Sequence, residues 1–306
     1  MSGLRLSERE VARLITLLER GDRSQISSLP SGQGHAHVIG VTGPPGSGKS
    51  TLVNALGTAV RAAGQTMAVL AIDPSSHLTG GAVLGDRVRM SSHSSDDGVF
   101  IRSMGTRGSG TGLATAARDA VRVLDAAGYD VVVVETVGVG QVELDVLTVA
   151  DTVAVVMVPG LGDTMQMNKA GIMEIGDVYV VNMADRPETD RFVKDLRQAL
   201  ALGARHDELP PICPTTAPSG EGVPDLWAAL VALDRRDRAS GRRERQRQAQ
   251  LRREFDQELR RHVLNRLAEL QADSERLGML RGQILAGGVL PSAAADEWAT
   301  HVELRD

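Results

Sequence analysis

The clearest chemistry in this sequence lies in the stretch GPPGSGKST, which occupies residues 43–51. Its spacing is G-x-x-x-x-G-K-[ST], in which glycines let backbone N–H groups turn inward around a phosphate. In this pattern the Lys49 ammonium would reach the β- and γ-phosphates, and the Ser50 hydroxyl would coordinate Mg²⁺. The pattern therefore predicts a nucleoside triphosphate site. Its expected contacts are Pro45, Gly46, Ser47, Gly48, Lys49, Ser50 and Thr51.

A magnesium ion beside a triphosphate also needs acidic ligands. Asp73 in AIDPSS and Glu135 in VVVVETVGVGQ follow apolar runs, and Asp86 lies in the loop-like stretch GGAVLGDRVRM. Ligands of a parallel sheet bind beyond the carboxyl ends of its strands, which is where Asp73 and Glu135 are expected. We therefore expect these three carboxylates to hold magnesium together with Ser50. The competing interpretation, strongest for Asp86, is a helix cap or a solvated loop residue.

Glu135 also opens the tetrapeptide ETVG, which is similar to the D-x-x-G pattern of nucleotide-responsive switches. Gly138 would then offer its backbone N–H to the γ-phosphate. The next residue is Val139, at a position where Ras-type enzymes carry a glutamine that orients the attacking water. Because a valine side chain cannot orient water, we expect hydrolysis without assistance to be slow.

Base recognition is predicted for the stretch VNMAD, which follows an apolar run. Guanine-binding loops commonly contain Asn-Lys-x-Asp. Asp185 would accept from guanine N1–H and N2–H, which adenine lacks, and Asn182 would brace the loop. Met183 replaces the lysine and keeps an apolar cover over the purine without adding charge, so selectivity should persist with weaker affinity. The later segment TTAPSGEG adds Thr216 and Ala217, and the Ala217 N–H is the expected donor to guanine O6.

Apolar runs and helical patterns alternate along the middle of the chain. Runs rich in Val and Ile predict buried strands, and the apolar periodicity between them predicts helices. Uninterrupted apolar strands separated by helices are typical of a parallel sheet covered on both faces, so the pattern predicts an α/β fold with a doubly wound, mostly parallel sheet. The expected strands are HVIGVTG, TMAVLAIDP, DVVVVETVG, DTVAVVMVPG, DVYVVNMAD and PPICPTTAP, and the expected helices start near 49, 111, 164, 188 and 224.

Composition limits the possible functions. The 306 residues carry a formal charge of -5, which favours neither nucleic acid nor a membrane surface as the main partner. Cys213 is the single cysteine and the seven histidines are scattered, so no cluster has the spacing of a zinc or nickel site. No apolar stretch reaches the roughly 18 residues of a membrane span, and the N-terminus lacks a signal-peptide pattern. We therefore expect a cytoplasmic location.

Both ends of the chain have helical patterns outside the alternating region. Near the N-terminus, Ser7 and Glu10 have the spacing of a capping box. From about residue 234 the sequence is rich in Arg, with interleaved Asp and Glu that favour a solvated helix over a nucleic-acid surface. Apolar residues recur every four positions here, which predicts a stripe that packs on the α/β domain or on a second subunit. The stripe consists of Leu251, Phe255, Leu259, Val263 and Leu267.

Taken in order, these segments resemble one family, the MeaB-type GTPases of the G3E group, which includes the methylmalonic aciduria type A proteins and ArgK-like proteins. The resemblance extends over roughly residues 38–232, with order and spacing intact. It implies a P-loop GTPase domain over residues 36–233, with helical extensions at both ends. The N-terminal extension would cover residues 1–35, and a C-terminal dimerisation arm would cover residues 234–306.

The resemblance also implies an activity and partners. The protein would be a homodimer that binds GTP or GDP with Mg²⁺ and hydrolyses GTP slowly without its partner. It would gate the loading of adenosylcobalamin from an adenosyltransferase into an acyl-CoA mutase and protect that mutase, although the link to cobalamin depends on the resemblance alone. The family's third switch maps onto Asp163, Gln166 and Lys169, which join Lys49 and Glu135 as the expected catalytic and coupling residues.

The third-switch residues can also be interpreted without the family. On a helix, positions spaced by three share one side, and a solvated polar face is the ordinary explanation. Lysine is rare in this chain, however. Of 34 basic residues only Lys49, Lys169 and Lys194 are lysines, which favours a function for Lys169.

Other functions remain to be compared with this one. A P-loop ATPase or kinase associated with basic amino-acid transport would require selectivity for ATP, which the VNMAD loop does not favour. A scaffold whose nucleotide is structural would fit the long C-terminal helix, and turnover stimulated by a partner would distinguish the two classes. A nickel-insertion GTPase is disfavoured because the metal-loading Cys/His cluster is missing from the sequence.

Overall fold

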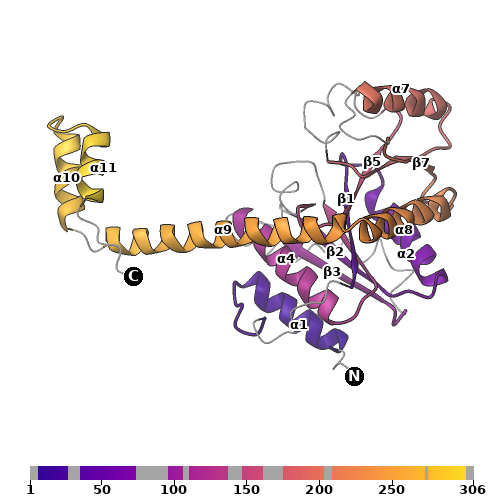
Figure 1. Ribbon diagram of the computed structural model, residues 1–306, viewed down its shortest axis with the longest axis horizontal. Helices are drawn as coiled ribbons and strands as arrows, with labels where there is room; N and C mark the ends of the chain where they lie inside the picture. Colours follow the sequence, from indigo (N-terminus) through magenta and orange to yellow (C-terminus); the bar gives the residue numbers. More distant parts are fainter. Residues whose placement is uncertain are drawn as a thin grey trace. The chain divides into compact units, whose positions relative to one another are not determined.

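The computed structural model describes residues 6–26, 35–73, 96–105, 110–136, 147–160, 175–202, 209–272 and 275–300. These residues form a seven-stranded parallel sheet in the order β3-β2-β4-β1-β5-β6-β7 (Figure 1). The expected α/β fold with a parallel sheet is therefore confirmed. The strands are β1 (His37–Thr42), β2 (Met67–Asp73), β3 (Val99–Gly105), β4 (Val131–Thr136), β5 (Thr152–Met157), β6 (Val178–Asn182) and β7 (Ile212–Thr215).

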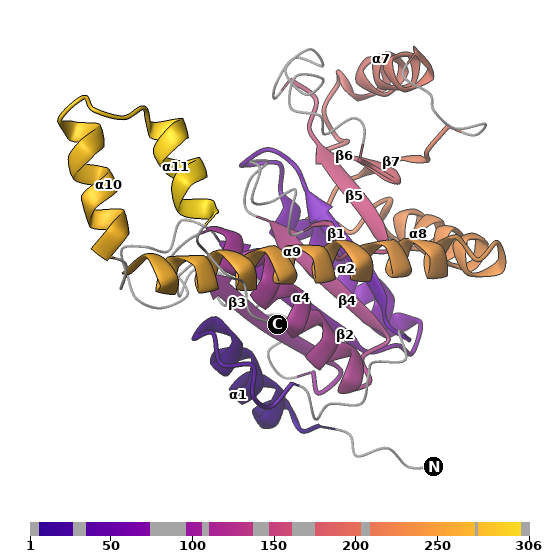
Figure 2. The same ribbon diagram turned by 60° about the vertical axis from the view of Figure 1, so that its left-hand side comes forward.

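Helices cover both faces of this sheet (Figure 2). On one face, α2 (Lys49–Ala62) packs beside α8 (Val223–Ala239). The other face carries α4 (Gly110–Ala126) and α7 (Thr189–Leu202), and α1 (Glu8–Glu19) packs against α4. Alternate strand residues enter the two apolar cores, as the pleat of a strand requires. Because both faces are covered, the chemistry of the sheet is confined to its two edges, where the strands end or begin.

Strand β3 is an element that the sequence pattern did not indicate. Its sequence, VFIRSMG, interrupts an apolar run with Arg102 and Ser103, which weakens the signal of a buried strand. The place of β3 at the end of the strand order explains the interruption. The Nη2 atom of Arg102 donates to Glu19 Oε2 at 2.8 Å and to Thr16 Oγ1 at 3.0 Å, both on α1. An edge strand can therefore carry an arginine that binds a neighbouring helix.

The N-terminal helix forms with the expected cap. Ser7 Oγ accepts the Glu10 N–H at 3.3 Å, and Glu10 Oε2 accepts the Ser7 N–H at 2.8 Å. This reciprocal pair satisfies two backbone donors that the first turn of a helix leaves free. Four apolar residues on one side of α1 are buried, namely Val11, Leu14, Ile15 and Leu18.

The chain divides into two compact units, Met1–Arg247 and Gln248–Asp306. Helix α9 (Arg242–Ala272) begins in the first unit. The second unit contains the rest of α9 together with α10 (Glu275–Leu285) and α11 (Pro291–Ala299), which pack against each other. The expected domain limits at 35/36 and 233/234 stay predictions.

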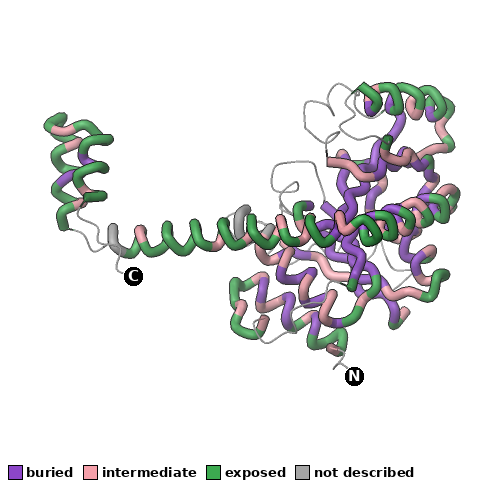
Figure 3. The backbone as a smooth tube through the Cα atoms, viewed as in Figure 1, coloured by how far each residue is buried: buried purple, intermediate pink, exposed green. Residues whose placement is uncertain are grey.

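The part of α9 that belongs to the second unit is largely exposed (Figure 3), and of the apolar stripe four residues are exposed and Leu267 is half-buried. The exposed fractions are 56% for Leu251, 67% for Phe255, 51% for Leu259 and 47% for Val263. Four large apolar side chains in a row on a solvent-facing helix are unusual for a monomer. Neither α9 nor any other helix in the described ranges combines the length and apolar character needed to cross a bilayer.

Candidate functional site

The phosphate-binding stretch joins the carboxyl end of β1 to the start of α2, as the motif requires. Gly43 and Gly48 have positive φ angles of 150° and 81°, which side chains rarely adopt. Space also excludes a side chain at both positions. A Cβ on Gly43 would lie 2.2 Å from the Val156 carbonyl oxygen, and a Cβ on Gly48 would lie 2.5 Å from Asn182 Nδ2. The loop therefore passes so close to β5 and to Asn182 that only glycine fits at these two points.

Lys49 is a buried cation at the start of α2. Its Nζ donates to the carbonyl oxygens of Gly43 at 2.9 Å and Pro44 at 3.1 Å. Burial lowers the pKa of the ammonium, and the nearby Glu135 carboxylate raises it and so opposes that effect. Backbone carbonyls are neutral partners, and an ammonium forms stronger hydrogen bonds with an anion. Lys49 is therefore placed to exchange these carbonyls for phosphate oxygens.

The two expected magnesium ligands that the structure describes are in direct contact. Ser50 Oγ donates to Glu135 Oε1 at 2.6 Å, and Glu135 is buried. A hydroxyl and a carboxylate oxygen side by side next to Lys49 form an oxygen donor set that fits Mg²⁺. Asp73 is the last residue of β2, and β2 pairs with β4, the strand that contains Glu135. The Asp73 side chain and the whole of Asp86 lie outside the described part of the structure.

Asn182 joins three loops at the carboxyl end of β6. Its Nδ2 donates to the Ser47 carbonyl oxygen of the phosphate loop at 2.8 Å. Its Oδ1 accepts from Thr215 Oγ1 and from the Ala217 N–H, each at 3.2 Å. This is the bracing geometry expected of Asn182. The Ala217 N–H, expected to donate to guanine O6, instead donates to Asn182 here, so a bound base would have to share or replace this contact.

Met183 and Asp185 occupy the remaining positions of the base-recognition loop. Met183 has a φ of 57°, and it is the one residue other than glycine with positive φ in the described part of the chain. Its Cε lies 4.0 Å from the place where a Cβ on Gly48 would be, so the methyl group reaches the phosphate loop. Asp185 is exposed, and the Thr216 N–H donates to the Glu221 carbonyl oxygen at 2.9 Å. The predicted roles of these residues in binding a base stay predictions.

Several expected functional residues fall outside the described ranges. They are Asp86, Gly138, Val139, Asp163, Gln166 and Lys169, together with the helix expected from 164. Pro45, Gly46 and Thr51 are exposed around the phosphate loop, and Ser47 is buried beneath it. The described carboxyl edge thus brings together Lys49, Ser50, Glu135 and Asn182.

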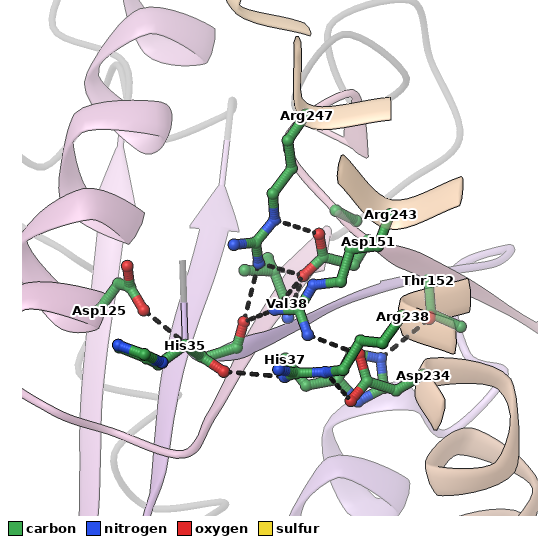
Figure 4. A network of polar contacts seen from close by, with 12 residues as sticks. His35, His37, Val38, Asp125, Asp151, Thr152, Asp234, Arg238, Arg243 and Arg247 are labelled. Atoms are coloured by element: carbon green, nitrogen blue, oxygen red, sulfur yellow. Dashed lines mark hydrogen bonds and ion pairs between the residues drawn. The ribbon is translucent and has the colours of Figure 1, made fainter. Parts of the chain in front are cut away.

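The opposite edge of the sheet contains a charged cluster that the sequence did not reveal (Figure 4). Asp151 directly precedes β5, and its carboxylate accepts two hydrogen bonds from Arg247, at 2.7 and 2.6 Å. It also accepts the Val38 N–H at 2.9 Å and lies 3.2 Å from Arg243 Nη2. Both arginines donate to the Ala36 carbonyl oxygen. The first turns of α9 are therefore fastened to the amino ends of β1 and β5.

Asp234 and Arg238 of α8 extend this cluster (Figure 4). Arg238 donates to Asp234 at 2.7 Å and to the His35 carbonyl oxygen at 2.9 Å. His37 is buried, and its Nε2 lies 2.9 Å from Thr152 Oγ1. Burial lowers the pKa of His37 to about 4, against the raising effect of Asp234 and Asp151, so the ring is neutral at pH 7. The cluster at the amino edge thus consists of paired ions and one neutral histidine.

Comparisons with known proteins agree with this architecture. A family model described as methylmalonyl-CoA mutase-associated GTPase MeaB matches residues 11–272. A Pyrococcus horikoshii protein that is named as a GTPase is 50% identical over 229 residues. The match covers 72% of this chain and 72% of that one. The mouse mitochondrial methylmalonic aciduria type A homolog is 32% identical over 263 residues, covering 84% of this chain and 63% of that one.

One solved structure is similar along nearly the whole chain. It is the crystal structure of an LAO/AO transport system kinase, with a TM-score of 0.70 and 27% identity, covering 97% of this chain and 93% of that one. The Escherichia coli GTPase ArgK is 36% identical over 234 residues, covering 74% of this chain and 71% of that one. From the family match over most of its length, together with the geometry at the carboxyl edge, the chain belongs to the MeaB family of P-loop GTPases.

Proposed function

We propose that this protein is a guanine-nucleotide switch that hydrolyses GTP and thereby controls an adenosylcobalamin-dependent acyl-CoA mutase. The observation that carries the nucleotide part is Asn182, which joins the phosphate loop, the base-recognition loop and the Thr215–Ala217 segment through its two side-chain atoms. Asn182 would thus set the distance between the phosphate-binding and base-binding parts of the site. A nucleotide that bridges the two subsites would be sensed by all three loops.

The chemistry at the phosphate end depends on electrostatic positioning. Lys49 would move from the Gly43 and Pro44 carbonyls to the β- and γ-phosphate oxygens. There its positive charge would stabilise the negative charge that develops on the leaving group. Ser50 and Glu135 would hold Mg²⁺, which supplies further positive charge when bound. Glu135 would orient the ion, since its carboxylate is buried against Ser50.

Slow turnover is part of the proposal. Val139 stands where Ras-type enzymes carry a glutamine that orients the attacking water, so this chain alone would hydrolyse GTP slowly. Gly138 would sense the γ-phosphate, and Asp163, Gln166 and Lys169 would pass the nucleotide state to the partner. A docked partner would then complete the site and accelerate hydrolysis.

The partner is proposed from the family and from chemistry. The family is named for association with methylmalonyl-CoA mutase, and one relative is a methylmalonic aciduria type A homolog. These names support an acyl-CoA mutase as the partner. An adenosyltransferase as the source of the mutase's cofactor is proposed from the family resemblance alone. The exposed stripe on α9 supports a homodimer, because a second subunit would cover the four large apolar residues. Cytoplasmic localisation is part of the same proposal.

The decisive experiment for the switch compares hydrolysis of GTP by the isolated protein with hydrolysis in the presence of candidate mutases from the same host. We expect slow turnover alone and clear stimulation by one mutase. Lys169→Ala should bind GTP normally and lose that stimulation. Fast hydrolysis by the isolated protein, or no stimulation by any mutase recovered with it from the host, would contradict the proposal.

A second candidate function is an ATPase or kinase in transport. The observation that favours it is the similarity to the structure of an LAO/AO transport system kinase. Its requirement is a preference for ATP over GTP. The aspartate at position 185 disfavours that preference, because adenine has no hydrogen-bond donor at positions 1 and 2, where guanine has its N1–H and N2 amino group. The nucleotide preference of the wild-type protein separates the two functions.

A further inference from the structure

The base-recognition loop has a cationic support at a position that the motif does not include. Arg186 directly follows Asp185, and its Nη1 donates to the Pro159 carbonyl oxygen at 2.8 Å. Pro159 is buried just beyond the carboxyl end of β5, and β5 pairs with β6, the strand that leads into the loop. The contact therefore ties the far side of the loop to the neighbouring strand.

The loop needs such a support because its backbone conformation is strained. Met183 has a φ of 57°, and non-glycine residues keep such angles only where the surrounding contacts fix them. The turn closes with the Arg186 N–H donating to the Met183 carbonyl oxygen at 3.2 Å. On the other side the Ala184 N–H donates to the Thr215 carbonyl oxygen at 3.0 Å. Asp185 lies between these two ties and is itself exposed.

In this loop the apolar cover and the positive charge are supplied by two different side chains, Met183 and Arg186. In loops of the Asn-Lys-x-Asp type, the lysine covers the base and directs its charge toward neighbouring loops. Here the side chain that reaches the phosphate loop from this position is Met183, whose terminal methyl group is neutral. The cation lies three positions later, in Arg186, and its partner is the Pro159 carbonyl oxygen just beyond β5 rather than the phosphate loop. A planar guanidinium on a buried carbonyl fixes direction better than a flexible ammonium does.

We propose that Arg186 is a specificity-positioning residue, which holds Asp185 in the orientation that recognises the guanine N2 amino group. The inference depends on the proposed guanine recognition and deepens it. Arg186 does not contact the base. It acts through the Pro159 carbonyl, which fixes the turn between Met183 and Arg186 and so the direction of the Asp185 carboxylate.

The test is the ratio of GTP to ITP affinity, measured by competition in the full-length protein with Mg²⁺. Hypoxanthine keeps the N1–H of guanine but lacks the N2 amino group, so the ratio reports one hydrogen bond of Asp185. We expect wild type to prefer GTP over ITP by roughly tenfold or more, the scale of one charge-assisted hydrogen bond. In Arg186→Ala this preference should fall by roughly threefold to tenfold.

The ratio separates positioning from a merely structural role. A variant that is partly unfolded binds both nucleotides less tightly by the same factor, so the ratio of affinities does not change. Arg191→Ala is the matched control, because Arg191 lies nearby in sequence on α7, is 88% exposed and forms a 3.8 Å ion pair with Asp195. It should leave both affinities and their ratio unchanged.

A double variant tests whether the cation can be supplied from the usual position. Met183→Lys combined with Arg186→Ala should recover much of the lost preference for GTP over ITP. A GTP-to-ITP affinity ratio in Arg186→Ala that equals the wild-type ratio, with or without equal losses of both affinities, would overturn the inference. The failure of the proposed function is distinct, because it would appear in the wild type as equal affinity for GTP and ATP.

Discussion

The carboxyl edge of the sheet and its amino edge both contain buried charges, but they differ in the partners of those charges. At the carboxyl edge, Lys49 donates to two backbone carbonyls. At the amino edge, Arg247 binds the Asp151 carboxylate with two hydrogen bonds, and Arg243 lies beside them. Neutral partners can be exchanged for a stronger anion, whereas paired ions are already satisfied. The comparison indicates that one edge is built to bind a ligand and the other to hold the fold.

The pKa shifts show the same contrast. Burial opposes ionisation of Asp151, but hydrogen bonds and charges from Arg247 and Arg243 outweigh it and lower the pKa of the carboxyl. Lys49 has the opposite balance: burial lowers the pKa of its ammonium, and Glu135 compensates only in part. A cation in that state gains from an incoming phosphate.

The largest effect is expected for Asp151→Ala. The substitution leaves Arg243 and Arg247 without their shared carboxylate in a buried place, which typically costs about 3–5 kcal/mol. The free energy of unfolding from a urea titration should fall by that amount, and Asp195→Ala on the exposed face of α7 should change it little. A loss below about 1 kcal/mol would show that the amino edge does not hold the fold.

Lys49→Ala should affect binding rather than folding. Removal of an ammonium that contacts the triphosphate should weaken GTP binding by about 3 kcal/mol, or more than a hundredfold. Stability should change little or rise, because the variant no longer buries a cation against neutral carbonyls. Calorimetric titration and thermal unfolding of the same sample measure the two quantities. Wild-type affinity in this variant would contradict the assignment of the phosphate site.

Acid should act on the amino edge through His37. Its pKa is about 4 in the folded protein and about 6.5 in the unfolded chain, so between these values the unfolded chain binds more protons. The stability that His37 contributes is complete above pH 6.5 and is lost as the pH falls toward 4, by about 2 kcal/mol at pH 5. Urea titrations at pH 7 and pH 5 should show this loss in wild type and a smaller one in His37→Gln. Equal losses in the two proteins would exclude His37 as the cause.

The smallest effect is expected at the base-recognition loop. Met183→Lys restores a cation near the phosphate loop and should tighten GTP binding by about 1 kcal/mol, the scale of one net hydrogen bond. Asp185→Asn should shift preference toward the xanthine nucleotide, because the amide can donate to its 2-oxo group. Competition titrations with GTP and XTP check both variants. Weaker GTP binding in Met183→Lys would show that the methyl cover matters more than the charge.

Sequence patterns indicated residues that meet at the carboxyl edge because the phosphate motif is local, and the roles of these residues in binding stay predictions. The phosphate loop lies within nine consecutive residues, and glycine, lysine and serine at fixed spacing follow from what a phosphate and Mg²⁺ require. The bracing by Asn182 was predicted from its place in the short stretch VNMAD. Its partners Ser47 and Ala217, which lie far away in the chain, were not predicted. The strands of the central sheet also carried a clear signal, since they are buried on both faces.

The amino edge could not be predicted in the same way. Asp151 and Arg247 are 96 positions apart, and no short-range spacing relates them. The many arginines around α9 gave a compositional signal only, and nothing in the pattern distinguished the anchored Arg243 and Arg247 from solvated ones. Arg186 was missed because its contact is with a backbone carbonyl, for which the sequence at Pro159 gives no indication. Tertiary contacts of this kind become visible only when the fold is known.

Binding of a guanine nucleotide at the carboxyl edge is measured by competition between GTP and ATP for the wild-type protein with Mg²⁺. Asp185 can accept hydrogen bonds from the N1–H and N2 amino group of guanine, and adenine has no donor at positions 1 and 2. We therefore expect GTP to bind at least roughly a hundredfold more tightly than ATP. Equal affinity for the two nucleotides, or a preference for ATP, would contradict the account.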